Sequence, residues 1–227
     1  MSVVECRGLS RSFRALDGTE VAAVRSVDLD VERGEFVAIQ GPSGSGKTTL
    51  LGLVAGLDVA ASGSTCLLGH DLGRLSATER AKLRQTQVGL VFQTFGLIAS
   101  LDALDNVTLP LAFAGRPATE RIDRGRAALE SVGLGELARA RVDELSGGER
   151  QRVGIARALA IGPSVILADE PTGSLDEGQG TAIVDLLVDC VRDTGTALLL
   201  VTHDPASAAR ADREYRMVDG RLAEVRS

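Results

Sequence analysis

The sequence predicts an α/β fold with a largely parallel sheet, an N-terminal antiparallel β subdomain and an inserted α-helical subdomain. Continuous apolar runs at residues 165–168 and 197–201 are typical of strands buried on both faces. Between these runs, apolar residues recur at helical spacing from Ile183 to Val191, and Gly195 follows as a stop signal. A strand, a helix and a second strand in this order indicate a parallel sheet.

Local patterns nearer the N-terminus predict the remaining strands. Residues 3–7 and 21–31 have alternating character, which predicts the strands of the antiparallel subdomain. Residues 35–40 form a short apolar strand, and residues 47–55 have the pattern of a helix. The glycine-rich segment between this strand and this helix therefore lies in a strand–loop–helix context.

The middle of the chain, residues 85–160, is expected to be mostly helical, with the clearer helices at 121–132 and 149–160. Gly162 and Pro163 end this insertion before the next apolar strand. We therefore expect a single domain over residues 1–227, in which 1–84 and 163–227 form the α/β core with its antiparallel β subdomain and 85–162 form the helical subdomain.

Composition argues against several classes of protein. The formal net charge is −6, which argues against a nucleic-acid surface because phosphate backbones select basic faces. The longest apolar stretch, residues 50–57, falls short of the about 20 residues that a membrane helix needs. Any membrane role is therefore expected to come through a partner. Cys6, Cys66 and Cys190 have neither disulfide nor zinc spacing, which favours reduced thiols in a cytoplasmic protein.

A complete phosphate-binding loop lies between the strand at 35–40 and the helix after it. Glycines let backbone N–H groups turn around a phosphate, and the helix N-terminus attracts the same anion. Lys47 can bridge β- and γ-phosphate oxygens and Thr48 can ligate Mg²⁺, which predicts ATP and Mg²⁺ as ligands. An ordinary glycine-rich loop is the alternative, and the strand–loop–helix context argues against it. The residues expected to bind ATP are Gly41, Pro42, Ser43, Gly44, Ser45, Gly46, Lys47, Thr48 and Thr49.

Acidic residues and a histidine follow two of the buried strands. Asp169 and Glu170 come directly after the strand at 165–168, at the sheet edge where parallel sheets bind ligands. Asp169 suits Mg²⁺, and Glu170 suits a base that aligns and polarises the attacking water. His203 follows the strand at 197–201 and can hydrogen-bond the γ-phosphate. We expect Glu170 and His203 to be catalytic. The strands at 35–40, 165–168 and 197–201 would then each be followed by residues that can bind a phosphate or act on it.

A second glycine-rich anion motif precedes the helix at 149–160. Ser146, Gly147 and Gly148 lie at its N-terminus, where unpaired N–H groups attract anions. Ser146 and Glu149 also have the spacing of a capping box, and both readings can hold. This motif is too distant in the sequence to share the first pocket easily, so the pair of motifs indicates an ATPase whose site closes between two subunits.

These motifs together resemble the nucleotide-binding subunits of ABC transporters over essentially the whole chain. Gly41–Thr48 resembles Walker A, 165–170 Walker B and 145–149 the signature motif, all in the order of that family. The resemblance implies that Gln93 is the Q-loop glutamine, which is a catalytic residue. It also implies that Gln93 binds the metal ion, as Thr48 and Asp169 do. It also makes Ser174-Leu175-Asp176 the D-loop, His203 the switch histidine and Phe13 the aromatic residue that stacks on adenine. Glu149 and Phe13 are departures, since the family most often has Gln and often Tyr there.

The resemblance implies an ABC ATPase fold and a head-to-tail homodimer with two ATP molecules between the subunits. Ser146, Gly147, Gly148, Glu149 and Asp176 would then bind ATP across the dimer. Four segments are similar to those of the lipoprotein-release and macrolide-export group (LolD and MacB type). These segments are residues 91–97, 104–111, 167–176 and 201–205. That group pairs with FtsX-like permeases, which implies a separate membrane permease as partner and a peripheral location on the inner face of the cell membrane. The apolar segment after Gln93 would lie near the surface that receives the permease.

Two other functions remain open at this stage. One is a mechanical or signalling ATPase, as in FtsE-like systems, which acts through a membrane partner without transport. The other is a soluble ABC ATPase scaffold. Co-purification with a membrane protein would favour the first over the second, and substrate-dependent ATPase activity in vesicles would identify a transporter.

Overall fold

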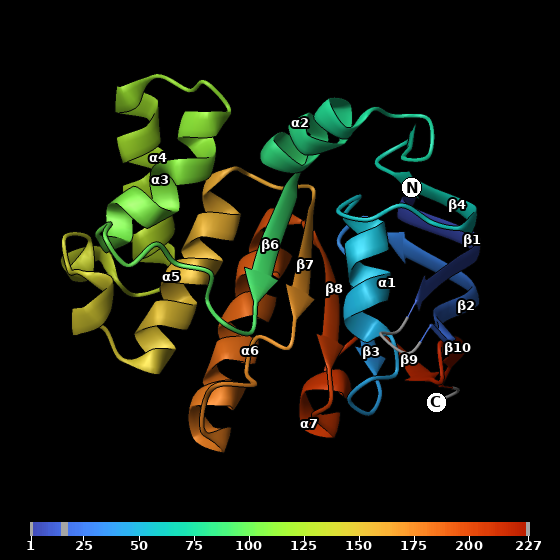
Figure 1. Ribbon diagram of the computed structural model, residues 1–227. Coiled ribbons are helices and arrows are strands. Elements are labelled where there is room, and N and C mark those ends of the chain that lie inside the picture. Colours follow the sequence, from blue (N-terminus) through green and yellow to red (C-terminus); the bar gives the residue numbers. More distant parts are fainter. Residues whose placement is uncertain (1, 15–17, 226–227) are drawn as a thin grey trace. The chain divides into compact units, whose positions relative to one another are not determined.

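The computed structural model describes residues 2–14 and 18–225. The chain folds into two compact units. Figure 1 shows their helices and strands. Unit 1 comprises Met1–Ala81 and Ala197–Ser227, and unit 2 comprises Lys82–Thr196. Helix α2 (Ala77–Gln87) contains the division point. The two units are described separately below.

Unit 1 holds two sheets. The antiparallel sheet has the strand order β2-β1-β4-β5, and the other has β10, β9, β3 and β8 side by side. β3 is parallel to both β8 and β9, whereas β10 is antiparallel to β9. Helices α1 (Lys47–Val54) and α7 (Pro205–Ala208) lie wholly within the unit, and the first residues of α2 also belong to it. The strands are β1 (Ser2–Arg14), β2 (Glu20–Glu32), β3 (Phe36–Gln40), β4 (Ser62–Leu67), β5 (His70–Asp71), β8 (Ala197–Thr202), β9 (Arg213–Val218) and β10 (Arg221–Glu224).

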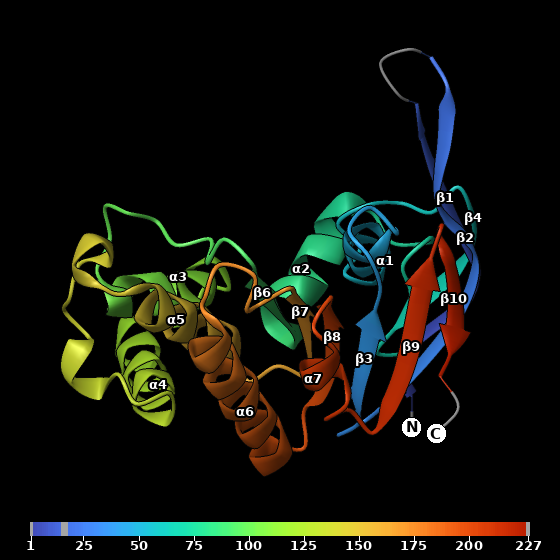
Figure 2. The same ribbon diagram turned by 90° about the horizontal axis from the view of Figure 1, so that it is seen from below.

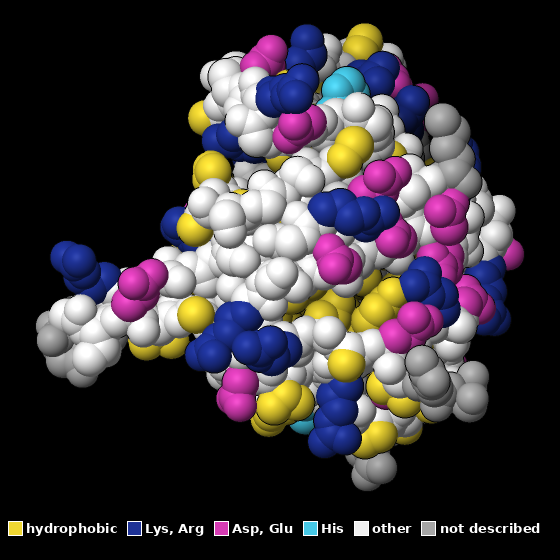
Figure 3. Space-filling view, turned by 90° about the vertical axis from the view of Figure 1, so that its right-hand side faces the viewer, with side chains coloured by type: hydrophobic (Ala, Val, Ile, Leu, Met, Phe, Trp, Pro, Cys, Tyr) yellow, Lys and Arg dark blue, Asp and Glu magenta, His cyan; other side chains and the backbone are white. Residues whose placement is uncertain are grey.

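The strands of unit 1 follow the expected apolar patterns. β3 and β8 are buried almost along their whole length, as their continuous apolar runs predict. β1 and β2 alternate between buried and exposed residues over part of their length and pair as an antiparallel ribbon. Figure 2 shows the far end of this ribbon projecting from the rest of unit 1. On the face shown in Figure 3, the described acidic and basic side chains are interspersed rather than gathered by sign.

Unit 2 combines two parallel strands with four α-helices in its described part. β6 (Val88–Phe92) pairs with β7 (Val165–Asp169). Helices α3, α4 and α5 contact one another and bury Leu104, Leu129 and Ile155 between them. The helices are α3 (Ala103–Phe113), α4 (Ala118–Ser131), α5 (Gly147–Ala160) and α6 (Glu177–Thr194), with 3₁₀ turns at Gly135–Leu137 and Val142–Glu144. Gly195 ends α6 in a left-handed conformation, as the sequence predicts.

One element differs from the sequence-based expectation. The segment 85–160 is expected to be mostly helical, yet Val88–Phe92 is a strand that pairs in register with β7. Its five residues are too few to show a period, so an apolar run alone does not separate a strand from a buried helix. The strand brings a backbone close to α5, because a Cβ on Gly89 would lie 3.1 Å from the Cβ of Ala158.

Candidate functional site

The phosphate-binding loop connects β3 to α1 in unit 1 and rests on backbone atoms of two other strands. A Cβ on Gly41 would lie 2.2 Å from the carbonyl oxygen of Met217 in β9. A Cβ on Gly46 would lie 2.0 Å from the carbonyl oxygen of Ala23 in β2, and Gly46 has a φ of 104°. Only glycine fits both positions, because backbone atoms at these distances cannot move aside as a flexible side chain can.

Lys47 places its ammonium group inside the arch of this loop. Its Nζ donates to the carbonyl oxygens of Gly41 at 2.8 Å and Pro42 at 3.0 Å, and its side chain is buried. The first turn of α1 contains no acidic residue, so its N–H groups face no local carboxylate. Thr48 lies exposed in that turn, and the buried Oγ of Ser45 has no hydrogen-bond partner among the described residues. Together these groups form a cationic, donor-rich loop at a helix N-terminus, which is the environment that binds phosphate.

His203 lies at the same edge of the sheet as the phosphate-binding loop. β3 and β8 are parallel, and Gln40 pairs with Thr202 at their carboxyl ends. The turn that carries His203 is held by Asp204, which accepts hydrogen bonds from the N–H groups of Ala206 and Ser207. The hydroxyl of Ser207 also donates to Asp204, and this bond is the main cause that lowers the pKa of the Asp204 carboxyl. His203 itself is exposed and lies beside the loop's edge of the sheet.

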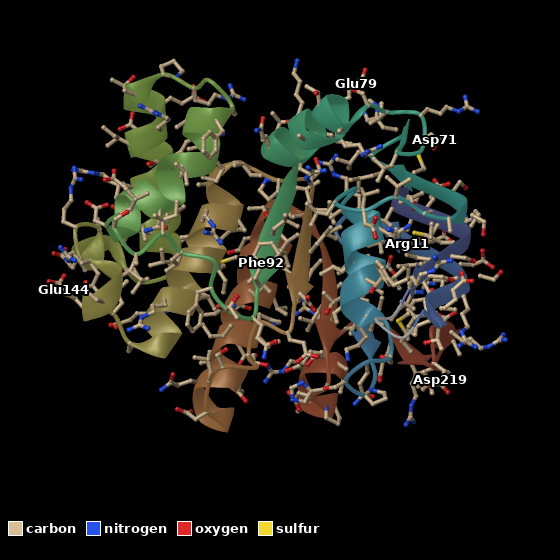
Figure 4. All side chains as sticks on the ribbon, viewed as in Figure 1. Arg11, Asp71, Glu79, Phe92, Glu144 and Asp219 are labelled. Carbon is tan, nitrogen blue, oxygen red and sulfur yellow. The ribbon has the colours of Figure 1, made fainter. Side chains whose placement is uncertain are left out.

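In unit 2, Gln93, Asp169 and Glu170 lie at the carboxyl ends of the adjacent strands β6 and β7. Phe92 pairs with Asp169 at the ends of β6 and β7, so Gln93 and Glu170 follow side by side (Figure 4 labels Phe92 at this end of β6). The Gln93 side chain lies against the turn after Glu170, since a Cβ on Gly173 would be 2.7 Å from its Nε2. Glu170 has a φ of 45°, a left-handed conformation that is strained for a residue with a Cβ.

The signature segment forms a complete capping box at the start of α5. Ser146 Oγ accepts from the Glu149 N–H at 3.3 Å, and Glu149 Oε2 accepts from the Ser146 N–H at 2.8 Å and its hydroxyl at 2.7 Å. The Ser146 hydroxyl, followed by its N–H, lowers the pKa of Glu149. Gly148 faces Gln179 of α6, whose N–H donates to Asp176 at 2.9 Å. The signature segment and the D-loop thus form two capped helix starts close to each other.

Phe13 lies near the described end of the β1–β2 ribbon and is 43% exposed, so it is not part of the hydrophobic core. The guanidinium carbon of Arg11 lies 4.9 Å from the centre of its ring. Arg11, which Figure 4 labels, also donates from its Nε to Asp58 Oδ2 at 2.8 Å. Sequence reasoning missed Arg11, although its i, i+2 spacing on a strand places it on the same face as Phe13.

The described residues fit a nucleoside triphosphate with its metal. The loop of unit 1 supplies backbone N–H groups and an ammonium for phosphate oxygens. In unit 1, Thr48 supplies a hydroxyl oxygen. In unit 2, Asp169 and Gln93 supply carboxylate and amide oxygens. Oxygens of these kinds are the hard ligands that Mg²⁺ takes. Within each unit the structure brings the expected residues together: the loop with His203 in unit 1, and Gln93 with Asp169 and Glu170 in unit 2.

These features define an ATP-binding cassette. Residues 24–173 match the ABC transporter family, and this chain belongs to that family. It is an ABC transporter ATP-binding domain and an ATPase, with the ABC ATPase fold that the sequence predicts.

Similar proteins indicate the group within the ABC transporter family to which this chain is related. The chain is 48% identical to the ABC transporter ATP-binding protein YbbA of Escherichia coli K12, over 98% of this chain and 97% of that protein. It is 40% identical to the lipoprotein-releasing system ATP-binding protein LolD of Roseobacter denitrificans, over 98% of each chain. It is 44% identical to the macrolide export ATP-binding/permease protein MacB of Rhodopseudomonas palustris, over 96% of this chain but only 33% of that protein. The expected similarity to the LolD and MacB group is confirmed.

A solved structure shares the fold over nearly the whole chain. The ATP-binding cassette MJ0796, in a dimeric post-hydrolysis state bound to ADP and Pi, superposes with a TM-score of 0.89 and 36% identity over 99% of both chains. Within residues 2–14 and 18–225, no helix has the length and apolar character needed to cross a membrane.

Proposed function

We propose that this chain is the ATP-hydrolysing subunit of a transporter and that it energises a separate FtsX-like permease through ATP-driven closure and opening of a homodimer. The observation that carries the proposal is the presence of two phosphate-suited helix starts, the loop before α1 and the signature segment before α5. LolD, which this chain matches over almost its full length, is named as the ATP-binding protein of a releasing system. The MJ0796 cassette is dimeric in its post-hydrolysis state, which supports the same assembly here.

In the proposed dimer, one subunit binds the phosphates with Gly41–Thr48 and Thr49, and Phe13 stacks on the adenine. The partner copy supplies its Ser146, Gly147, Gly148, Glu149 and Asp176. The γ-phosphate reaches both subunits, whereas ADP lacks it, so ATP binds the closed state more tightly than ADP does. This difference in affinity is what shifts the population toward closure.

Glu170 orients the attacking water and accepts its proton, and His203 donates a hydrogen bond to the γ-phosphate. Thr48, Asp169 and Gln93 would hold Mg²⁺, which neutralises charge on the phosphate oxygens when it is bound. Loss of the γ-phosphate after hydrolysis removes the contacts that joined the subunits, and the dimer opens.

A groove in unit 2 suits the permease. It has a volume of about 300 Å³ and a mainly apolar lining that includes Phe92, Leu109, Pro110 and Phe113, together with Arg84 and Arg157. Phe92 and Phe113 are both exposed in this groove, and a patch of exposed large apolar side chains is typical of a surface that a partner covers. Gln93 directly follows Phe92, so a segment seated in this groove would lie next to the metal-binding glutamine. We place the membrane partner here and the chain itself on the inner face of the membrane.

The test uses the Glu170→Gln variant, which keeps the shape of the side chain and removes the base. With ATP and Mg²⁺, this variant should bind nucleotide, hydrolyse it slowly and accumulate as dimers in light scattering, whereas ADP should leave it monomeric. Wild-type turnover in this variant would remove Glu170 from its role. A strictly monomeric variant at saturating ATP and Mg²⁺, with the membrane component supplied, would refute the dimer.

The partner requires a separate experiment. The protein should co-purify with a membrane permease, and the pair should show substrate-dependent ATPase activity in vesicles. Co-purification without such dependence would indicate a signalling ATPase instead of a transporter.

A further inference from the structure

The backbone of the Q-loop segment, residues 92–96, is held by side chains from elsewhere in unit 2. Four of its five carbonyl oxygens accept a side-chain hydrogen bond. Gln151 Nε2 donates to Phe92 at 3.3 Å, and Ser174 Oγ donates to Gln93 at 3.0 Å. Arg157 donates from one nitrogen to Phe95 at 2.9 Å and from the other to Gly96.

Arg157 binds the most constrained part of this segment. Phe95 and Gly96 both have a φ of 59°, in the left-handed region, and a phenylalanine rarely adopts this conformation unless its surroundings enforce it. The two carbonyls that the guanidinium joins belong to these two residues. A fork of fixed geometry can hold two successive carbonyls in one orientation, which a flexible ammonium cannot do.

The surroundings of Arg157 are built for this contact. Arg157 is half-buried, and this burial lowers the pKa of its guanidinium. The two carbonyl dipoles replace part of the hydration that the ion loses. Gly154, about one turn earlier on α5, lies against the segment, since a Cβ there would be 3.4 Å from the carbonyl oxygen of Phe95, an ordinary contact distance. Helix α5 therefore contacts residues 92–96 through Gln151, Gly154 and Arg157 on one face.

We propose that Arg157 is a positioning residue for ATP hydrolysis, which fixes residues 92–96 so that the side chain of Gln93 lies at the metal site. This inference rests on the proposed role of Gln93. Because α5 begins at the signature segment, Arg157 also joins the residues that bind ATP across the dimer to the glutamine that binds the metal. Phe92, Gly96 and Arg157 also line the groove in unit 2. A permease segment bound there would therefore touch the residues that form the contact between Arg157 and the Q-loop segment.

The test compares Arg157→Lys and Arg157→Met with Arg126→Lys, an exposed arginine on α4 that serves as the matched control. Both Arg157 variants should lower kcat at least about tenfold, since small misplacements of a reacting group have effects of this size or more. They should also raise the Mg²⁺ concentration needed for half-maximal activity, while the Kd for ATP measured in EDTA stays unchanged. Hydrogen exchange of residues 94–98 should become faster.

The role would be overturned if kcat and the Mg²⁺ requirement of Arg157→Lys equal those of Arg126→Lys, or if exchange at 94–98 does not change. If Arg157→Met does not fold, Arg157→Lys and Ser174→Ala, which releases the Gln93 carbonyl, give the same readouts. Gln93→Ala separates this inference from its premise. A normal Mg²⁺ requirement in Gln93→Ala refutes the metal role of the glutamine, whereas the exchange measurement still tests the Arg157 contact by itself.

Discussion

Glu170 combines the proposed catalytic base with a left-handed backbone, φ 45°, and this combination yields a sharp prediction. Left-handed geometry costs a residue with a Cβ about 1–2 kcal/mol, and glycine avoids this cost. Glycine in turn loses about 0.5–1 kcal/mol more conformational entropy than alanine on folding. Glu170→Gly should therefore be more stable than Glu170→Ala by about 0.5–1 kcal/mol.

The comparison of Ala with Gly isolates the backbone, because both variants lose the carboxylate and every contact it makes. The expected difference corresponds to a Tm of Glu170→Gly that is about 1–4 °C higher, measured by scanning calorimetry without nucleotide. At Arg126 in the interior of α4, the order should reverse, with alanine more stable than glycine by about 1 kcal/mol. Both Glu170 variants should lose about 10²–10⁴-fold in kcat, the usual contribution of a general base. Equal stability of the two, or a more stable Glu170→Ala, would refute the idea that the base is held under strain.

Three further predictions concern nucleotide and the signature helix. Lys47→Ala should lose most of its affinity for ATP in titration calorimetry, and unchanged binding would contradict the assignment of the phosphate-binding loop. The lowered pKa of Glu149 means that its carboxylate stabilises α5 above the usual pKa of 4.5 and that this contribution is lost as pH falls through the lowered value. Glu149→Gln should therefore show a smaller loss of Tm on acidification than the wild type. Phe13→Ala should weaken ATP binding about fivefold or more with little change in Tm, and Arg11→Ala should have a smaller effect in the same direction because it removes only support for the ring.

Residues whose chemistry lies within one short stretch could be predicted from the sequence. The phosphate-binding loop and the capping box of Ser146 and Glu149 are local patterns whose spacing is set by backbone geometry. The strand end that carries Glu170 could be located because a buried apolar run directly precedes it. The expected roles of Gln93, Asp176 and Phe13 depend instead on resemblance to a family.

Contacts between distant segments could not be predicted in this way. Arg157 lies in a helix with several arginines, and its spacing does not indicate that it holds residues 92–96 rather than a surface position. The carbonyl groups of Ala23 and Met217 that lie beneath Gly46 and Gly41 carry no side-chain signal, because any residue has a carbonyl oxygen. The missed strand Val88–Phe92 belongs to the same class, since only its pairing with β7 distinguishes it from a helix.

Gly41 and Gly46 lie directly against carbonyl oxygens of β9 and β2, so mutations in these strands can affect ATP binding. A substitution that shifts either strand by a few tenths of an ångström would reshape the loop from below, although the altered side chain never approaches the triphosphate. Genetic screens for lost ATP affinity should therefore recover changes around Ala23 and Met217. Such alleles would be mistaken for folding defects unless binding and melting were measured on the same samples.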